Sequence, residues 1–412
     1  MTEKAKRKGN PRRRLLFQLL IVIGLIIALI SAGVYVLRPT EAEIVFIAPD
    51  DEGIDQVWIT NLNNPENPHQ LSSLSENQSL IRLLTMPDSP VIVYQYMDSN
   101  LHTQQMMILN LKTDSSQIIG CGSSPLTYRC DVALHDDWIA YFAFKSSGHS
   151  TEELMLTLFN VETEEQREIY EINRRRGEDM RYLQWIADTN VLVFHNQTLA
   201  VNAGGYTYYP DESYGFYSLD EDRIINTLEI LNDRTIPEQL PYNPQNLIGL
   251  PLFSPDGTRY AITMNADNSP IQSDLVIYQE ISPGSLEFGF SNSAIYTDSP
   301  LALDWHPDSE QVIVQGFVVS RSSTDSSTLE HYYRLDIYNA VSDETRTIEQ
   351  VVAEYDRAYP TANFNHDGSM VLFARPVQGE TYYQLAYFDV ESEENVALPL
   401  SGHNPQWVNG GR

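Results

Sequence analysis

Short runs of apolar and β-branched residues recur along the chain from residue 43 onward, and no convincing amphipathic helix lies between them. Clusters of Gly, Pro, Asn, Asp and Ser separate the runs, as is typical of strands joined by turns. The strongest runs are IVFIA (44–48), VIVYQ (91–95), IAYFA (139–143), VLVFH (191–195), YAITM (260–264), VIVQG (312–316) and VLFAR (371–375). The pattern therefore predicts an all-β fold.

A similar polar turn precedes four of these runs, in FSPDGTRY (253–260), WHPDSEQV (305–312), FNHDGSMV (364–371) and LTMPDSPV (84–91). Pro255 presets φ for a turn, and Gly257 suits the left-handed position that closes it. Asp256 recurs as Asp308 and Asp367, whereas a catalytic carboxylate would usually occur once, with a partner tuned against it. We therefore interpret Asp256 as a turn residue.

The runs recur about every 50 residues, with about four short strands in each interval, as in the blades of a β-propeller. FSPDGTRYAIT (253–263) and EIVFIAPDDEGIDQVWITNLNNPENPHQLS (43–72) resemble the TolB-type propeller repeat, a relative of WD-type repeats. The resemblance covers about residues 43–408 as seven units and implies a seven-bladed propeller. HNPQWVNGG (403–411) is similar to the first strand that the first unit lacks. We expect this C-terminal strand to close the first blade.

An apolar run at residues 15–37 follows a basic tail at residues 1–14, which contains seven Lys and Arg residues. The run is long enough to cross a bilayer and longer than the apolar region of a cleaved signal peptide. The charge asymmetry predicts a cytoplasmic N-terminus, a single-pass anchor, a linker at 38–42 and an extracytoplasmic propeller at 43–412. Cleavage near 31–33 is the alternative. The expected location is the cell membrane.

The chain has a formal net charge of −30 at pH 7 despite its basic tail. A body this acidic repels a phosphate backbone, so we expect no nucleic-acid binding. The acid excess favours solubility, or a protein partner with a basic patch at the cell envelope.

The two cysteines of the chain, Cys121 and Cys130, are close enough in sequence to form a disulfide bond outside the cytoplasm. Two buried free thiols are the alternative. PDDEGID (49–55) contains several carboxylates but lacks the spacing of a calcium loop, so no metal site is predicted.

A tyrosine-rich insertion in the fourth unit is the best candidate contact surface, through Tyr206, Tyr208, Tyr209 and Tyr214. Exposed Tyr on a Gly-flexed loop would suit a protein or glycan patch. An ordinary strand over residues 214–217 is the alternative interpretation.

No nucleophile elbow, paired-histidine metal motif or phosphate loop occurs in the sequence. The sequence therefore favours a non-enzymatic scaffold for protein interactions at the cell envelope, with no catalytic residues and no cofactor. The alternative is a propeller that binds a ligand or glycan in its central channel or at the tyrosine insertion.

Overall fold

The computed structural model describes residues 43–86, 89–100, 103–121, 131–145, 153–172, 178–201, 207–225, 252–265, 273–282, 285–291, 298–321, 329–352, 361–377 and 382–408. The chain divides into two compact units, 1–42 and 43–412, and all described residues belong to the second. The tail and the apolar run at 15–37 lie outside the described residues. Within the described ranges, no helix is long and apolar enough to cross a membrane.

The described residues form seven antiparallel sheets of four strands each. Sheet 1 contains β28 (His403–Val408), β1 (Glu43–Pro49), β2 (Asp55–Asn61) and β3 (Asn64–Gln70). Sheet 2 contains β4 (Gln78–Thr85), β5 (Val91–Asp98), β6 (Thr103–Asn110) and β7 (Ser115–Cys121). Sheet 3 contains β8 (Val132–His135), β9 (Trp138–Lys145), β10 (Glu153–Asn160) and β11 (Gln166–Ile172).

Sheet 4 contains β12 (Glu178–Ile186), β13 (Val191–Val201), β14 (Thr207–Ser218) and β15 (Arg223–Ile225), with a short 3₁₀ turn at Ala187–Thr189. Sheet 5 contains β16 (Leu252–Phe253), β17 (Arg259–Asn265), β18 (Ser273–Ser282) and β19 (Ser285–Ser291). Sheet 6 contains β20 (Asp298–Trp305), β21 (Gln311–Arg321), β22 (Leu329–Asn339) and β23 (Glu344–Val352). Sheet 7 contains β24 (Ala362–Phe364), β25 (Met370–Pro376), β26 (Tyr383–Asp389) and β27 (Glu394–Ser401).

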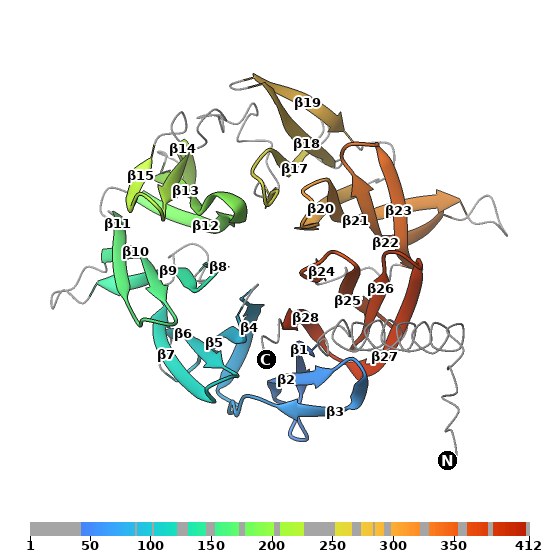
Figure 1. Ribbon diagram of the computed structural model, residues 1–412, viewed down its shortest axis with the longest axis horizontal. Coiled ribbons are helices and arrows are strands. Elements are labelled where there is room, and N and C mark those ends of the chain that lie inside the picture. The colour runs from blue at the N-terminus through green and yellow to red at the C-terminus, as the bar shows by residue number, and fades with distance from the viewer. Residues whose placement is uncertain are drawn as a thin grey trace, which may run out of the picture. The chain divides into compact units, whose positions relative to one another are not determined.

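The sheets of this unit follow one another around a ring, with the first strand of each nearest the centre (Figure 1). This arrangement is a β-propeller. The innermost strand of sheet 1 is β28, which pairs antiparallel with β1 through Ile44 opposite Trp407 and Val45 opposite Gln406. The C-terminal strand thus completes the sheet that β1 begins, as the sequence predicts.

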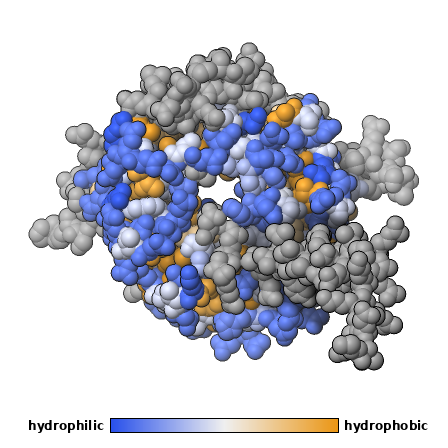
Figure 2. All heavy atoms as spheres, in the orientation of Figure 1, coloured by the Kyte–Doolittle hydropathy of each residue, from blue (hydrophilic) through white to orange (hydrophobic). Residues whose placement is uncertain are grey.

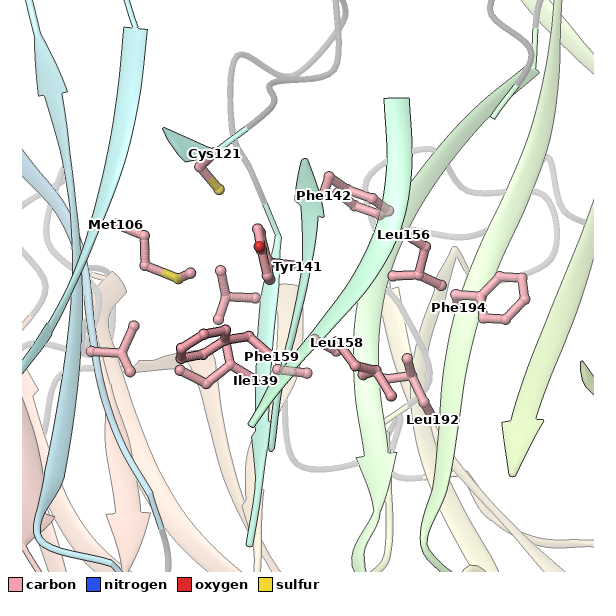
Figure 3. Close-up of a cluster of buried hydrophobic side chains, with 14 of the residues drawn as sticks. Met106, Cys121, Ile139, Tyr141, Phe142, Leu156, Leu158, Phe159, Leu192 and Phe194 are labelled. Carbon is pink, nitrogen blue, oxygen red and sulfur yellow. The ribbon is translucent and has the colours of Figure 1, made fainter. Parts of the chain in front are cut away.

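Each sheet of a propeller packs against a neighbour on both faces, which explains why the strongest runs are continuously apolar. In sheet 3, Ile139 and Tyr141 point toward Met106 of sheet 2 (Figure 3). Phe142 points the other way, beside Leu156 and toward sheet 4. Because a strand alternates its side chains between two faces, a strand buried on both faces loses the polar alternation of a half-exposed one.

Indole groups hold neighbouring sheets together near the centre of the ring. In three sheets, the Trp on the innermost strand donates its Nε1–H to a backbone carbonyl oxygen of the preceding sheet. The pairs are Trp185 with Ala133 at 3.3 Å, Trp305 with Leu252 at 2.8 Å and Trp407 with Asn363 at 3.1 Å. The bulky residue of the repeat therefore supplies both apolar burial and a hydrogen bond between sheets.

The turn residue Asp256 is confirmed as structural. Its Oδ1 accepts hydrogen bonds from the Thr258 N–H at 2.9 Å and the Ser254 hydroxyl at 2.7 Å. Gly257 has φ of +69°. Ser309 occupies the equivalent left-handed position in sheet 6 with φ of +62°, and its hydroxyl accepts a hydrogen bond from the Asp256 N–H at 3.1 Å. The turns thus contact one another from sheet to sheet.

Candidate functional site

A cavity of about 640 Å³ lies among the innermost strands. Its lining comes from β4, β20, β24 and β28 and from the turns near Asp188 and Pro255. Figure 2 shows a hollow at the centre of the ring, with many hydrophilic residues around it. Residues on the innermost strands alternate in burial: Asn363 and Gln406 are half-buried, whereas Phe364 and Trp407 are buried. The lining therefore combines polar side chains such as Asn363 and Gln406 with apolar ones such as Leu83 and Trp305.

The side chain that precedes the bulky residue of an innermost strand joins its sheet to the next sheet. Gln184 makes two such bonds: it accepts from the Phe253 N–H at 3.2 Å and donates to the Phe253 carbonyl oxygen at 3.1 Å. Asp304 accepts from the Phe364 N–H at 2.8 Å. Asn363 donates through Nδ2 to the carbonyl oxygen of Pro405 at 2.8 Å. One position of the repeat thus links three pairs of sheets.

Asp304 is the acidic member of this set, and it lines the cavity. Burial raises the pKa of its carboxyl group from about 3.8 to about 7, although the backbone N–H groups of Phe364 and Trp305 act in the opposite direction. The residue keeps part of its surface open, while dense protein surrounds the carboxyl group. The neutral carboxylic acid therefore persists to a higher pH here than at an ordinary aspartate. Such a group can both donate a proton and accept one.

The remaining lining is mixed in chemistry. Arg82 is exposed and donates to the carbonyl oxygen of Val132 at 3.4 Å. Asn404 lines the cavity with φ of +48°, a left-handed conformation that Asn tolerates better than most residues. The Thr361 hydroxyl oxygen is buried and has no hydrogen-bond partner among the described atoms. Hydrogen-bond donors and acceptors therefore line the cavity together with two acids, Asp304 and Asp188.

The predicted tyrosine patch lies largely on a strand, where a loop was expected. Residues 207–218 form the strand β14, so Tyr208, Tyr209 and Tyr214 belong to a long hairpin with β13, and Tyr206 lies outside the described residues. Gly215 pairs with Phe194, and a Cβ added to Gly215 would lie 2.0 Å from the Phe194 ring. A glycine is therefore needed here because the Phe194 ring occupies the space of a side chain, and not because the segment is a flexible loop. The patch itself stays a prediction.

Cys121 is buried at the end of β7 and takes part in a disulfide bond. Its predicted partner, Cys130, lies outside the described residues, so the pairing remains a prediction. Within the described ranges, no group of three or more His, Cys, Asp or Glu residues could hold a metal ion. In the turn at residues 50–54, the Asp50 carboxylate accepts hydrogen bonds from the N–H groups of Glu52 and Ile54.

Comparisons with known proteins support the propeller fold. No protein-family model matches the chain, and no curated protein matches it. Oligogalacturonate lyase from Vibrio parahaemolyticus superposes with a TM-score of 0.51 at 13% identity, covering 87% of this chain and 96% of that chain. A putative 6-phosphogluconolactonase from Bacteroides fragilis gives 0.51 at 10% identity, covering 90% and 99%. Prolyl oligopeptidase B from Galerina marginata gives 0.54 at 10% identity, covering 88% of this chain and 51% of that chain.

These similarities correct the interpretation of the chain as a non-enzymatic scaffold. The named neighbours are enzymes, namely a lyase, a lactonase and a peptidase, so the propeller fold gives no ground for excluding catalysis. A contiguous motif could not reveal this cavity, because its lining comes from several strands that are distant in the sequence. The signal that could have revealed Asp304 was an acid directly before the bulky Trp305 of a repeat.

Proposed function

We propose that this chain is an enzyme that hydrolyses a carbon–oxygen bond of a sugar-like substrate in its central cavity, with Asp304 as the general acid. The observation that carries the proposal is the position of Asp304 in the cavity, where burial raises its pKa to about 7. A general acid works best when its pKa lies near the working pH, because it must hold a proton and also release it.

In the proposed reaction, Asp304 gives its proton to the departing oxygen while water adds to the electrophilic carbon, and the proton that the added water loses returns Asp304 to its neutral form. The hydrogen bond from the Phe364 N–H fixes the carboxyl group beside β24 and stabilises the carboxylate that forms after proton transfer. Deep burial favours return to the neutral acid, so the group is reset for the next turnover.

The proposed substrate class rests on the lining and on the names of two full-length neighbours. Amide and hydroxyl groups of Asn363, Asn404, Gln406 and Thr361 offer both donors and acceptors, which suits a molecule rich in hydroxyl groups. The lyase and the lactonase are named for oligogalacturonate and 6-phosphogluconolactone, both derived from sugars. Their names favour this substrate class over a peptide, because their whole chains match this one.

We also propose the number of blades, the membrane anchor and the protein partner. The seven sheets would be the blades of a single TolB-type ring, supported by the repeated turns at 253–260, 305–312 and 364–371. Residues 15–37 would anchor the chain in the cell membrane with the N-terminus inside, supported by their length and flanking charge. A basic protein partner at the envelope remains a prediction.

The test is a hydrolysis assay of the full-length chain in detergent. The probes are nitrophenyl glycosides and neutral sugar lactones, followed from about pH 5 to pH 9. We expect kcat to fall as the pH rises through about 7, and Asp304→Asn to lower kcat by about 10²–10⁴-fold. Asp256→Asn, a carboxylate change in a turn, is the matched control and should leave kcat unchanged. Wild-type rates in Asp304→Asn, or no turnover of any probe, would overturn the proposal.

A further inference from the structure

One member of the repeated inner position departs from the others. Gln184, Asp304 and Asn363 each bind the backbone of the next sheet, and Gln406 occupies the same place in sheet 1, directly before Trp407. Within the described part of the chain, the side-chain amide of Gln406 makes no hydrogen bond to protein. It is half-buried and lines the cavity. The counterparts of Gln406 link two sheets, whereas its own amide is available to bind a ligand.

A second unused polar group lies on the neighbouring sheet. The Thr361 hydroxyl oxygen is buried without a partner among the described atoms, and Thr361 precedes β24 and lines the same cavity. Two hydrogen bonds join β24 to β28: Asn363 Nδ2 donates to Pro405, and Trp407 Nε1 donates to the Asn363 carbonyl oxygen. The strand that carries Gln406 is therefore fixed against the strand that follows Thr361.

We propose that Gln406 and Thr361 form a subsite that recognises a hydroxyl group of a neutral saccharide in the cavity. The subsite rests on the proposed function and adds the residues that select the substrate. The Thr361 hydroxyl is buried without a partner, which costs about 1–3 kcal/mol, and a ligand hydroxyl bonded to it removes that cost, while the half-buried Gln406 amide exchanges water for the ligand. A saccharide that lacks the hydroxyl leaves the cost in place, which is the basis of selection.

A neutral ligand fits the surrounding charge better than an anion does. Arg82 lines the cavity, but it is exposed and already donates to the Val132 carbonyl oxygen. Asp304 and Asp188 also line the cavity, and the chain carries a net charge of −30. Asp188 and the acidic body oppose an acidic ligand through like-charge repulsion, and Asp304 adds to this repulsion when it is ionised.

The position of Gln406 on β28 adds a readout that does not depend on activity. A saccharide held by Gln406 and Thr361 connects the strand that completes sheet 1 with sheet 7. Ligand that binds only the closed ring stabilises it by mass action. We therefore expect bound saccharide to slow amide hydrogen exchange in residues 403–408 more than in the outer strand β15.

The experiment measures calorimetric binding of maltose, cellobiose and digalacturonate to the full-length Asp304→Asn variant, which removes turnover. Thr361→Val and Gln406→Leu are then added singly. Each should weaken binding of the neutral disaccharide by about 10-fold, the loss expected for one hydrogen bond to a ligand. Gln406→Asn is the conservative variant in case Gln406→Leu fails to fold, and Gln56→Leu, distant in sheet 1, is a stability control.

The outcomes separate this inference from the proposed function. Neutral disaccharide binding that depends on Thr361 and Gln406 supports the subsite even if no turnover is found, in which case only the enzyme proposal fails. Turnover with binding unaffected by both substitutions overturns the subsite and leaves the enzyme proposal standing. Binding of digalacturonate alone, or of none of the three probes, also overturns the subsite.

Discussion

Asp304 accepts a hydrogen bond from the backbone N–H of Phe364 at 2.8 Å and so joins β20 to β24. In the equivalent place, Gln184 accepts from the N–H of Phe253 and also donates to its carbonyl oxygen. An ionised Asp304 can copy the first of these bonds but not the second, because it has no proton to donate. The repeat therefore contains a neutral amide in one sheet and a titrating acid in another.

Replacing Asp304 with Asn should raise stability at alkaline pH. The pKa of Asp304 is raised on folding to about 7, so its stabilising effect is complete below about pH 4 and is lost as the pH rises through about 7. Asn has no proton to lose and resembles Gln184. Urea unfolding at about pH 8 should show the variant more stable by about 1–3 kcal/mol, with little gain at about pH 4.

Asp308→Asn is the control, because the stability that Asp308 contributes should depend on pH in the opposite direction. Burial acts to raise the pKa of Asp308, but hydrogen bonds from the Glu310 N–H and the Gln311 side chain and the charge of His306 outweigh it, and the pKa is lowered. Its stabilising effect is present above the unfolded pKa and is lost as the pH falls. Identical pH profiles for the two variants would contradict the assignment for Asp304.

Replacing Trp305 with Phe should destabilise the ring by about 1–3 kcal/mol, because the Leu252 carbonyl oxygen loses its donor at the junction of sheets 5 and 6. Trp58→Phe is the matched control. Its indole donates to the Ala48 carbonyl oxygen at 3.0 Å within a single sheet, and the residue is only half-buried. Chemical unfolding should show the smaller loss for Trp58→Phe, and equal losses would argue against a special role for bonds between sheets.

Gly368→Ala should be the most damaging of three glycine substitutions. Gly368 has φ of +74°, and an added Cβ would lie 1.8 Å from Nε2 of His306. Gly53 has φ of +80° with open space around it, and Gly120 has open space without a positive φ. We expect losses of about 2–4 kcal/mol at Gly368, about 1 kcal/mol at Gly53 and near zero at Gly120. If thermal unfolding showed Gly53→Ala to be the least stable of the three variants, the contact between residue 368 and His306 would be unimportant.

Replacing Asp256 with Ala should lower stability by about 1–2 kcal/mol and leave any activity unchanged, because its carboxylate satisfies the turn and lies outside the cavity lining. Burial acts to raise the pKa of Asp256, but hydrogen bonds from Thr258 and Ser254 and the charge of Arg259 lower it below its ordinary value. The stability difference should therefore shrink as the solution is made acidic, because protonation removes it from the wild type. A loss of catalytic rate at wild-type stability would revive the catalytic interpretation.

The sequence predicts the repeat well because each repeated feature has a local cause. Asp256 and Gly257 are required by the geometry of their own turn, so the pattern can be recognised from eight consecutive residues. The pairing of β28 with β1 was predictable as well, since HNPQW supplies the strand that the first unit lacks.

The cavity was not predictable, because its chemistry depends on neighbours distant in the sequence. Asp304 looks like an ordinary acid in a strand until Phe364, on the next sheet, is placed beside it. Gln406 differs from Gln184 only in lacking a link to the next sheet, which no local pattern encodes. The requirement for Gly215 is equally hidden in the sequence, because it arises from the Phe194 ring on the paired strand.

The pairing of β1 with β28 also constrains how the protein can be made. β1 is the first of the described strands to leave the ribosome and β28 is the last, so Val45 and Ile47 face an open sheet edge until all other strands have been synthesised. An open apolar edge is prone to pair with another chain. Slow elongation should therefore favour aggregation through β1, and a chaperone that covers this strand would protect the nascent chain.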